Sequence, residues 1–323
     1  MVHTLILTES TSSSPKMQAN PTGYITSTLF EESYWLDAAA PGQWQAAEVC
    51  QDGKVIGRLP FVAKRKQGLR LITLPPCTPW LGPWIRPSGG KPTTELSHQH
   101  QVLEKLIKQL PRYDISVLSC APEFTNLMAL GWAGYKFSMG YTYRLDDLSS
   151  EAILWNGLRD TVRRLCRKAE KQTVVTTHHN IRDYIGVLEK TFKRQGKDVS
   201  YLFSDLERID DVMSARKQRL IYTAEDASGR LHAGAYVVFD ERHSFYLSGA
   251  GDPELRESGG QSLAVWHAIK ETIGRSKIFD FDGTSVQGIE YFMRGFGPQQ
   301  RHRYTATRTA GLGKLWAMKN ALT

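Results

Sequence analysis

One order of predicted elements occurs twice along this chain, and it constrains the fold more than any other feature. In each half, antiparallel strand patterns are followed by a helix, a strand, a second helix and a last strand. The first copy begins with two extended runs on either side of an Asp52-Gly53 hairpin turn. Three helices, predicted at 150–171, 181–195 and 205–214, precede the second copy. This order predicts an α/β protein built from two similar units.

The two halves also share short stretches of sequence. The segment Asp52 to Val62 aligns with Ser228 to Val238, since each has a turn glycine, a basic residue and then a strand pattern. Together with the element order, this similarity indicates a duplicated unit. We therefore expect an N-terminal unit over residues 1–148 and a C-terminal unit over residues 149–323. Each should contain a mixed, largely antiparallel sheet flanked by helices.

The composition excludes several classes of protein. With 41% apolar and 10% aromatic residues in 323, the chain is rich enough in apolar side chains to build a folded core. No run approaches the roughly 18 apolar residues that span a bilayer, and the N-terminus does not resemble a signal peptide. The four cysteines are scattered and show no metal-binding spacing, which favours a reducing compartment such as the cytoplasm. A net charge of +8 favours anionic partners.

A glycine-rich stretch stands directly before the helix predicted at 262–273. Glycines at a helix N-terminus leave backbone N–H groups accessible, and such groups bind anions. The alternative is a plain glycine turn without a ligand. On the first interpretation, the anion site consists of Arg256, Ser258, Gly259, Gly260, Gln261 and Ser262.

Two aspartates alternate with phenylalanines in the strand predicted over "KIFDFD". On a strand, Asp280 and Asp282 share one face and lie roughly 6.5–7 Å apart, which suits the lining of a groove better than a shared proton. The alternative is that Asp282 only fixes the turn at Gly283. Thr284 and Gln287 then form a predicted capping box for a helix over 285–294.

The helix predicted at 150–171 carries the strongest concentration of charge. Four basic residues are spaced four apart on one of its faces, and each such like-charged pair costs roughly 0.2–0.5 kcal/mol. Nearby acids such as Asp160 and Glu170, or a bound phosphate group, would offset that cost. A solvated basic face is the alternative. The four basic residues are Arg159, Arg163, Arg167 and Lys171.

The element order resembles the GNAT acyltransferase fold, and two such units in tandem resemble the Fem-type peptidyltransferases and the double-GNAT acetyltransferases. This resemblance implies that the glycine stretch holds the pyrophosphate of an acyl-CoA. The family pattern is Gln/Arg-x-x-Gly-x-Gly/Ala. Arg256 and Gly259 match its first two fixed positions, but Gln261 stands at the last one, where the family has Gly or Ala.

The run "YFMRGF" resembles the GNAT signature Tyr-x-x-x-Gly-Phe. The resemblance implies that Tyr291 protonates the departing thiolate, whereas a helical tyrosine used only for packing is the alternative. Asp282 is our first choice of general base and Asp280 the second. Fem-type enzymes have a lysine where Met293 stands, so this position favours acyl-CoA over aminoacyl-tRNA as the donor.

The acceptor is expected to be a primary amine. In Fem-like proteins the stretch equivalent to "TPWLGPWI" borders the acceptor groove, so Trp80 and Trp84 are expected to form a partly exposed ledge, with interdomain packing as the alternative. The further substrate-site residues that we predict are Arg163, Arg167, Tyr246 and Ser248. An amino sugar, a peptidoglycan-type peptide, a lipid amine and a natural-product intermediate all remain open as acceptors.

The sequence therefore leads to an N-acyltransferase that uses acyl-CoA, most simply acetyl-CoA, and no metal ion. The predicted site is a cleft between splayed strands of the second half, with the glycines on one side and Asp282 and Tyr291 on the other. One alternative is a Fem-like transferase that uses aminoacyl-tRNA. The other is a basic binding module without catalytic activity, which the charge of the 150–171 helix would serve.

Overall fold

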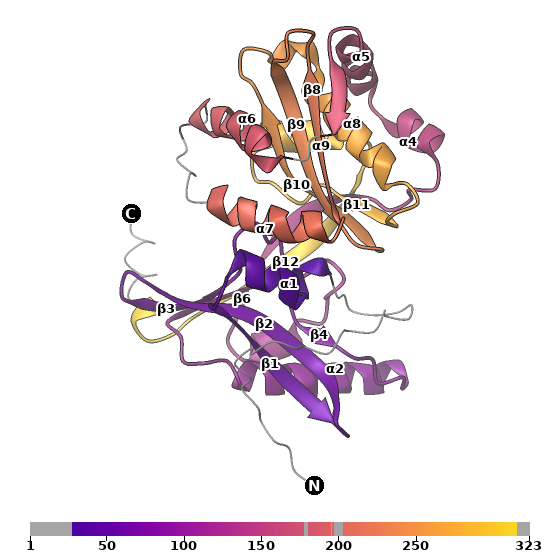
Figure 1. The fold of residues 1–323 in the computed structure, drawn as a ribbon. Helices are drawn as coiled ribbons and strands as arrows, with labels where there is room; N and C mark the ends of the chain where they lie inside the picture. Colours follow the sequence, from indigo (N-terminus) through magenta and orange to yellow (C-terminus); the bar gives the residue numbers. More distant parts are fainter. Residues whose placement is uncertain (1–27, 178–179, 195, 197–202, 315–323) are drawn as a thin grey trace. The chain divides into compact units, whose positions relative to one another are not determined.

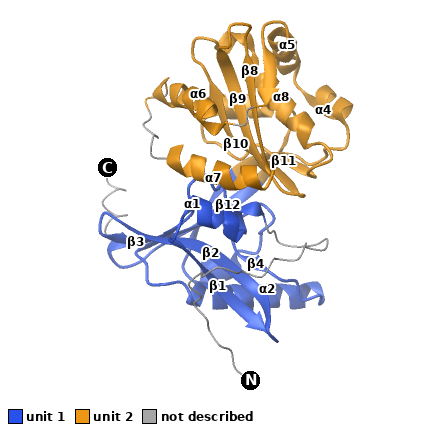
Figure 2. Ribbon diagram, viewed as in Figure 1, with its two compact units in different colours: residues 1–140, 302–323 blue, residues 141–301 orange. Residues whose placement is uncertain are grey.

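The structure, a computed structural model, describes residues 28–177, 180–194, 196 and 203–314. The chain divides into two compact units, residues 1–140 with 302–323 and residues 141–301 (Figure 2). The divisions fall within strands β6 (Lys136–Leu145) and β12 (Gln299–Thr309). Residues 302–314 thus group with the first unit, although we expected them in the second. The predicted boundary at 148/149, taken from the sequence repeat, stays a prediction.

The first unit contains a largely antiparallel sheet. Its strand order is β1 (Trp44–Gln51), β2 (Lys54–Lys66), β3 (Leu69–Thr73), β5 (Ile115–Ser119) and β12, and β3 and β5 are the parallel pair. Strand β4 (Trp84–Ile85) pairs with β2. The predicted hairpin turn is confirmed, because Asp52 and Gly53 both have positive φ angles.

Helix α2 (Pro92–Lys108) covers this sheet, and its inward face packs on β1 and β2. The other helices of the unit are η1 (Leu29–Glu31), α1 (Ser33–Ala39) and α3 (Met128–Trp132). We predicted α3 at 123–130, so it begins five residues later than expected. Close packing explains one glycine here, since a Cβ on Gly57 would lie 2.2 Å from the Val102 side chain.

The second unit has a mixed, largely antiparallel sheet, as the sequence predicts. Its strand order is β11 (Ile278–Asp280), β10 (His243–Gly251), β9 (Leu231–Phe239), β8 (Arg219–Glu225) and β7 (Val174–Thr177), and the end of β6 pairs with β11. The pair β10 and β11 is parallel and the others are antiparallel. The helices are α4 (Glu151–Gly157), α5 (Asp160–Ala169), α6 (Ile181–Arg194), α7 (Phe203–Ala215), η3 (Arg256–Ser258), α8 (Gly260–Thr272) and α9 (Gln287–Arg294) (Figure 1).

Helices α6 and α8 cover opposite faces of this sheet. Tyr184 of α6 packs against Gly234 and Tyr236, whereas the core beneath α8 contains Ala235 and Val237. Alternate residues of a strand point to opposite faces, so the two sets identify the two sides. Within the described ranges, no helix has the length and apolar character needed to cross a bilayer.

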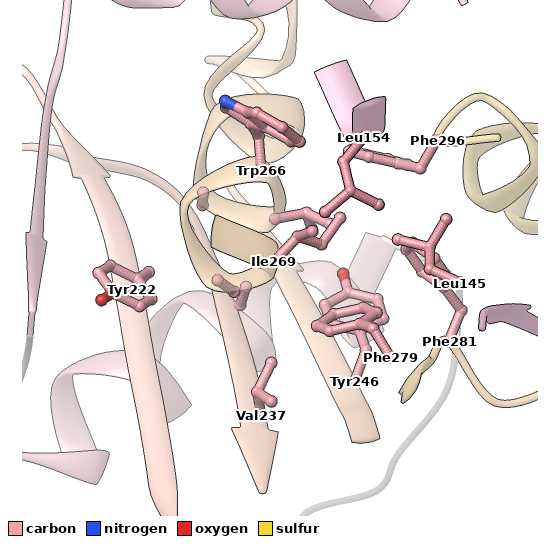
Figure 3. Close-up of a cluster of buried hydrophobic side chains, with 14 of the residues drawn as sticks. Leu145, Leu154, Tyr222, Val237, Tyr246, Trp266, Ile269, Phe279, Phe281 and Phe296 are labelled. Carbon is pink, nitrogen blue, oxygen red and sulfur yellow. The ribbon is translucent and has the colours of Figure 1, made fainter. Parts of the chain in front are cut away.

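The core between α8 and the sheet combines aliphatic and aromatic side chains (Figure 3). Trp266 and Ile269 of α8 are buried, as the predicted helix face requires. The ring of Phe279 on β11 lies 4.9 Å, centroid to centroid, from that of Phe281, which directly follows the strand, and Phe296 packs on Phe281 at 5.5 Å. The phenylalanines that alternate with the two aspartates are therefore core residues.

The helix that we predicted at 150–171 is two helices. Leu158 and Arg159 adopt extended conformations between α4 and α5. The backbone N–H of Arg159 donates to the carbonyl of Gly295, 2.8 Å away, at the end of α9. A Cβ on Gly297 would lie 2.4 Å from the carbonyl oxygen of Gly157. The break therefore exists because the chain docks on the end of α9 at this point.

Candidate functional site

The glycine stretch lies where the sequence predicts, but protein covers it. Gly259 has a φ of 82° and is buried under α5, and a Cβ on it would lie 2.5 Å from the carbonyl oxygen of Leu165. Nearby, the Lys168 ammonium donates to the carbonyl of Glu257, 2.6 Å away. These contacts give Gly259 a packing role, because only glycine allows this conformation and this close approach.

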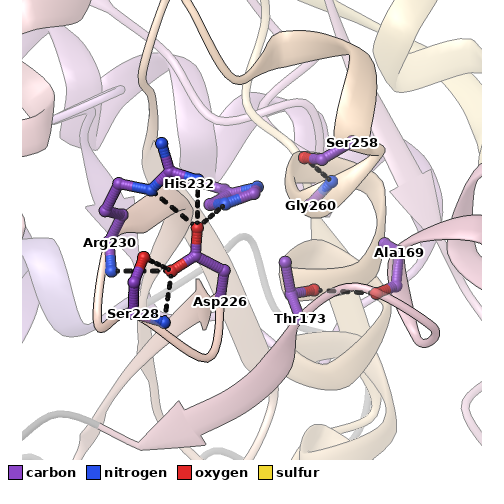
Figure 4. A network of polar contacts seen from close by, with 8 residues as sticks. All are labelled: Ala169, Thr173, Asp226, Ser228, Arg230, His232, Ser258 and Gly260. Carbon is purple, nitrogen blue, oxygen red and sulfur yellow. Dashed lines mark hydrogen bonds and ion pairs between the residues drawn. The ribbon is translucent and has the colours of Figure 1, made fainter.

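The next glycine, Gly260, is also buried, and Figure 4 shows its contact with Ser258. Its N–H donates to the Ser258 hydroxyl at 3.1 Å, and a Cβ on it would lie 3.2 Å from the Cβ of His232. His232 contacts the carboxylate of Asp226, and hydrogen bonds from Ser228 and His232 hold the pKa of Asp226 well below its usual range. The start of α8 therefore packs against a hairpin turn that hydrogen bonds hold in place, and it does not form an open anion site.

The other residues that we predicted around the donor phosphates divide into buried and exposed ones. The Gln261 side chain donates to the carbonyl of Gly234 at 3.0 Å and to the Tyr246 hydroxyl at 3.1 Å. Ser262 is buried, whereas Arg256 is exposed. Of the predicted set, Arg256 is thus the side chain that solvent reaches most readily.

Strands β10 and β11 separate where we predicted a cleft. They pair only between His243–Phe245 and Ile278–Asp280. Directly after this point, β10 shifts its register relative to β9, between Tyr246 and Ser248. Tyr246 is buried with its ring 6.2 Å from that of Phe281, so side chains fill the space between the diverging strands. Burial also raises the pKa of the Tyr246 phenol. At this point the cleft that we expected is occupied by the packed rings of Tyr246 and Phe281.

Ser248, the other predicted substrate residue on β10, points to a different partner. Its hydroxyl lies 2.7 Å from the hydroxyl of Tyr184 on α6. Tyr184 is fully buried, and burial raises its pKa well above the usual value. Ser248 therefore helps to hold α6 on the sheet.

One continuous segment connects the end of α9 with the start of α8. This segment is residues 157–165. Its first part contacts the end of α9, since Gly157 contacts Gly297 and a Cβ on Gly295 would lie 2.7 Å from the Val162 side chain. Its last residue, Leu165, covers Gly259 before α8. The donor loop and the Tyr291 helix, which we expected to face a common cleft, are therefore both packed against α5 and the residues before it.

Asp280 makes a structural ion pair. Its side chain is fully buried, accepts a hydrogen bond from Thr142 and lies 2.5 Å from the Arg144 guanidinium. Burial raises the pKa of Asp280, and Arg144 opposes this shift. A carboxylate held in this way is unsuited to accept a substrate proton, so Asp280 is not our choice of general base.

Asp282 lies beyond the strand rather than on it. Strand β11 ends at Asp280, and Asp282 adopts a left-handed conformation with a φ of 60°, so the two carboxylates do not share a strand face as predicted. The Asp282 N–H donates to Asp280 at 2.8 Å. The predicted capping box is also wrong: α9 begins at Gln287, and Thr284 instead accepts a hydrogen bond from the N–H of Val286.

Tyr291 of α9 is exposed and lies between two cations. Its side chain is 56% exposed, the Arg159 guanidinium lies 4.5 Å from its ring centre, and that of Arg294 lies 5.7 Å away. Among the residues that the structure describes, none forms a hydrogen bond with the Tyr291 hydroxyl. The phenol is therefore accessible to a ligand in a positive environment.

A polar network beside Tyr291 was not predicted from the sequence. Glu290 forms the expected pair with Arg294 at 3.1 Å, but it also accepts a hydrogen bond from the Tyr143 hydroxyl at 3.1 Å. Gln300 donates to the same hydroxyl at 2.9 Å. Burial raises the pKa of Tyr143. No local signal marks this network, because Tyr143 and Glu290 lie 147 positions apart in the sequence.

The two tryptophans expected on the acceptor side are buried in the first unit. Trp80 is 0% exposed and packs edge-on against Phe30 at 6.2 Å, and Trp84 is 6% exposed with Arg86 over its ring. The partly exposed ledge that we predicted is therefore wrong, since both indoles are buried. Over the described ranges, no His, Cys, Asp and Glu side chains gather as a metal site would require.

The two arginines that we predicted as substrate residues are partly engaged within the unit. Arg163 donates to the carbonyls of Trp155 and Asn156 and pairs with Asp160. Arg167 lies over the Trp155 ring at 5.6 Å. Both face the outer side of α5.

A pair of glycine variants tests the packing role of Gly259. Gly259→Ala is expected to lower the free energy of unfolding by more than about 2 kcal/mol, because strain at positive φ adds to the clash with Leu165. Gly274→Ala is the matched control: its φ is 78°, nothing lies within 4 Å of the added Cβ, and about 1 kcal/mol is expected. Urea unfolding measures both losses, and equal losses would show that α5 does not constrain Gly259.

Comparisons with known proteins agree with this architecture. Residues 156–288 match the family model described as Acetyltransferase (GNAT) domain. The crystal structure of FemX is similar with a TM-score of 0.65 at 14% identity, covering 87% of this chain and 92% of that one. A tandem GNAT protein from the clavulanic acid biosynthesis pathway has a TM-score of 0.52 at 12% identity, with 83% of each chain covered. No curated protein matches the chain by sequence.

A further similar structure is the C-terminal domain of a putative lysylphosphatidylglycerol synthetase from Agrobacterium fabrum. Its TM-score is 0.50 at 12% identity, covering 86% of this chain and 88% of that one. The chain therefore has a tandem GNAT, Fem-like fold, and residues 156–288 of its second unit match the GNAT domain model. Such a domain implies an acyltransferase that uses acyl-CoA. The matched stretch ends shortly before Tyr291.

Proposed function

We propose that the protein is an N-acyltransferase that transfers an acyl group from acyl-CoA to a primary amine. The matched GNAT domain and the tandem fold support the reaction class. The single observation that carries the proposal is the exposed Tyr291 phenol, which has no hydrogen-bond partner among the described side chains and lies between Arg159 and Arg294. This arrangement suits a proton donor to a departing anion.

In the proposed reaction, the amine attacks the thioester carbonyl, the new C–N bond forms and the C–S bond breaks. Asp282 accepts the proton that the amine loses, and Tyr291 gives a proton to the departing thiolate and later regains one from solvent. The guanidinium groups of Arg159 and Arg294 stabilise negative charge near the phenol. Asp280 acts only through its ion pair with Arg144, which fixes the strand end before Asp282.

We assign donor binding and catalysis to the second unit and acceptor recognition to the first. An amino sugar or a peptide amine remains the proposed acceptor class. We also propose that the protein acts in the cytoplasm, and the four cysteines, all present as thiols, are consistent with a reducing compartment.

A second candidate donor is aminoacyl-tRNA. The observation that favours it is the packing of α5 over Gly259, which leaves the basic outer face of α5 as the exposed positive surface of this region. Met293, which stands where Fem-type enzymes have a lysine, counts against it. Acyl-CoA therefore stays the first candidate.

The proposal is tested by giving the purified chain acetyl-CoA and a panel of primary amines and following thiol release. Release that depends on the amine is the expected result. In parallel, aminoacyl-tRNA with a labelled amino acid is offered to the same amines. Transfer only from tRNA would replace the first candidate by the second, and transfer from neither donor would favour the non-catalytic binding module.

A further inference from the structure

The outer face of α5 presents a row of cations. Together with Arg163, the exposed side chains of Arg164, Arg167, Lys168 and Lys171 line a hollow of about 520 Å³. Arg164, Arg167 and Lys168 lie on α5, where a rise of about 1.5 Å per residue separates Arg164 from Lys168 by roughly 6 Å, and Lys171 lies in the turn after the helix ends at Ala169. A row of this length can contact more than one phosphate group at a time.

Only part of this charge is neutralised within the protein. Asp160 pairs with Arg163, and Lys168 donates to a neutral carbonyl. The side chains of Arg164 and Lys171 have no hydrogen-bond or ion-pair partner in the described part of the chain. The helix dipole stabilises cations near the end of α5, but Arg164 lies in the middle of the helix and gains little from it.

The position of this face relates it to the proposed reaction. Directly before α5, Arg159 contacts the exposed ring of Tyr291. Near the C-terminal end of α5, Lys168 contacts the backbone at Glu257. Between them, Leu165 covers Gly259 and closes the anion site that the sequence predicts. The phosphates of a donor that reaches Tyr291 must then bind outside α5.

We propose that the outer face of α5 binds the phosphate groups of the nucleotide-bearing acyl donor. The ligands are Arg164, Arg167, Lys168 and Lys171, and the glycines at the start of α8 serve packing instead. Coenzyme A and tRNA both carry phosphates, so this chemistry is common to the two donors. The inference depends on the proposed function only for the identity of the ligand.

The test compares two charge-matched double variants. Arg164→Gln with Lys171→Gln removes two cations from the α5 face, and Arg216→Gln with Lys277→Gln removes two exposed cations elsewhere on the same unit. Calorimetry measures binding of coenzyme A, inorganic pyrophosphate and total tRNA to each protein. We expect the α5 variant to lose at least about 10-fold in affinity for the donor type that binds, and the control to change less than about 2-fold.

Salt dependence distinguishes the two sources of phosphate. If tRNA is the ligand, the magnitude of the slope of log affinity against log salt should fall by roughly 1.4–1.8 in the α5 variant, since each of the two lost phosphate contacts contributes about 0.7–0.9. If coenzyme A is the ligand, its binding falls instead and tRNA binds all proteins weakly and alike. Equal affinities in both variants, or no binding of any probe to the unchanged protein, would overturn the proposal.

The same proteins separate this inference from the proposed function. Acyl transfer by the unchanged protein with equal donor binding in all variants would remove the α5 site and leave the reaction standing. Specific loss of phosphate binding in the α5 variant, without transfer from either donor, would support the site and contradict the proposed reaction.

Discussion

Replacing Asp280 by alanine is expected to lower the free energy of unfolding by about 3–5 kcal/mol. The carboxylate and the Arg144 guanidinium are both buried, with side chains 0% and 3% exposed. Removing one partner leaves the other charge without compensation in a site that water does not reach. The variant also loses the hydrogen bonds from Thr142 and from the N–H of Asp282.

Urea unfolding at neutral pH measures this loss. Glu104→Ala is the control, because the Glu104 and Lys108 side chains of its ion pair are 60% and 70% exposed. Such exposed pairs contribute about 0–1 kcal/mol to the free energy of unfolding. The double variant Asp280→Ala with Arg144→Met should recover part of the loss, since no unpaired buried charge remains. A loss below about 1 kcal/mol for Asp280→Ala would show that water or another group compensates Arg144.

The element order follows from local sequence patterns, and most of it is confirmed. The Asp52-Gly53 turn, the strands of the second unit and helix α8 all depend on periodicity and turn residues within a few positions. The break at Leu158 and Arg159 depends on contacts with Gly295 and Gly297, which lie far away in the sequence. Helix propensity carries no information about such contacts, so one long helix was predicted instead of two.

The same distinction applies to the candidate site. The sequence located the glycines before α8, the helix with Tyr291 and the basic face of α5, and the structure adds that Tyr291 is exposed. It did not reveal that α5 covers Gly259, because that depends on how two helices pack. It also treated Asp280 as a groove residue, since nothing near it in the chain indicates the partner Arg144 on β6. Charge and glycine patterns thus identify candidates, whereas packing decides which of them a ligand can reach.

Tyr291→Phe is expected to reduce kcat for transfer from acyl-CoA by about 100-fold while the KM for the donor changes less than about 2-fold. The variant keeps the ring between Arg159 and Arg294 and removes only the hydroxyl, so packing and local charge stay the same. Steady-state kinetics with the best amine acceptor measure both constants. Tyr304→Phe, at a partly buried position in the other unit, is the control and should leave kcat unchanged.

The leaving group provides a sharper test of what the hydroxyl does. An alkyl thiolate such as that of coenzyme A is a stronger base than an aryl thiolate and therefore gains more from a proton donor as the C–S bond breaks. An aryl thioester should thus lose much less rate than acyl-CoA when Tyr291 becomes phenylalanine. Equal losses for the two donors would mean that the hydroxyl positions the substrate, because positioning does not depend on the basicity of the departing sulfur.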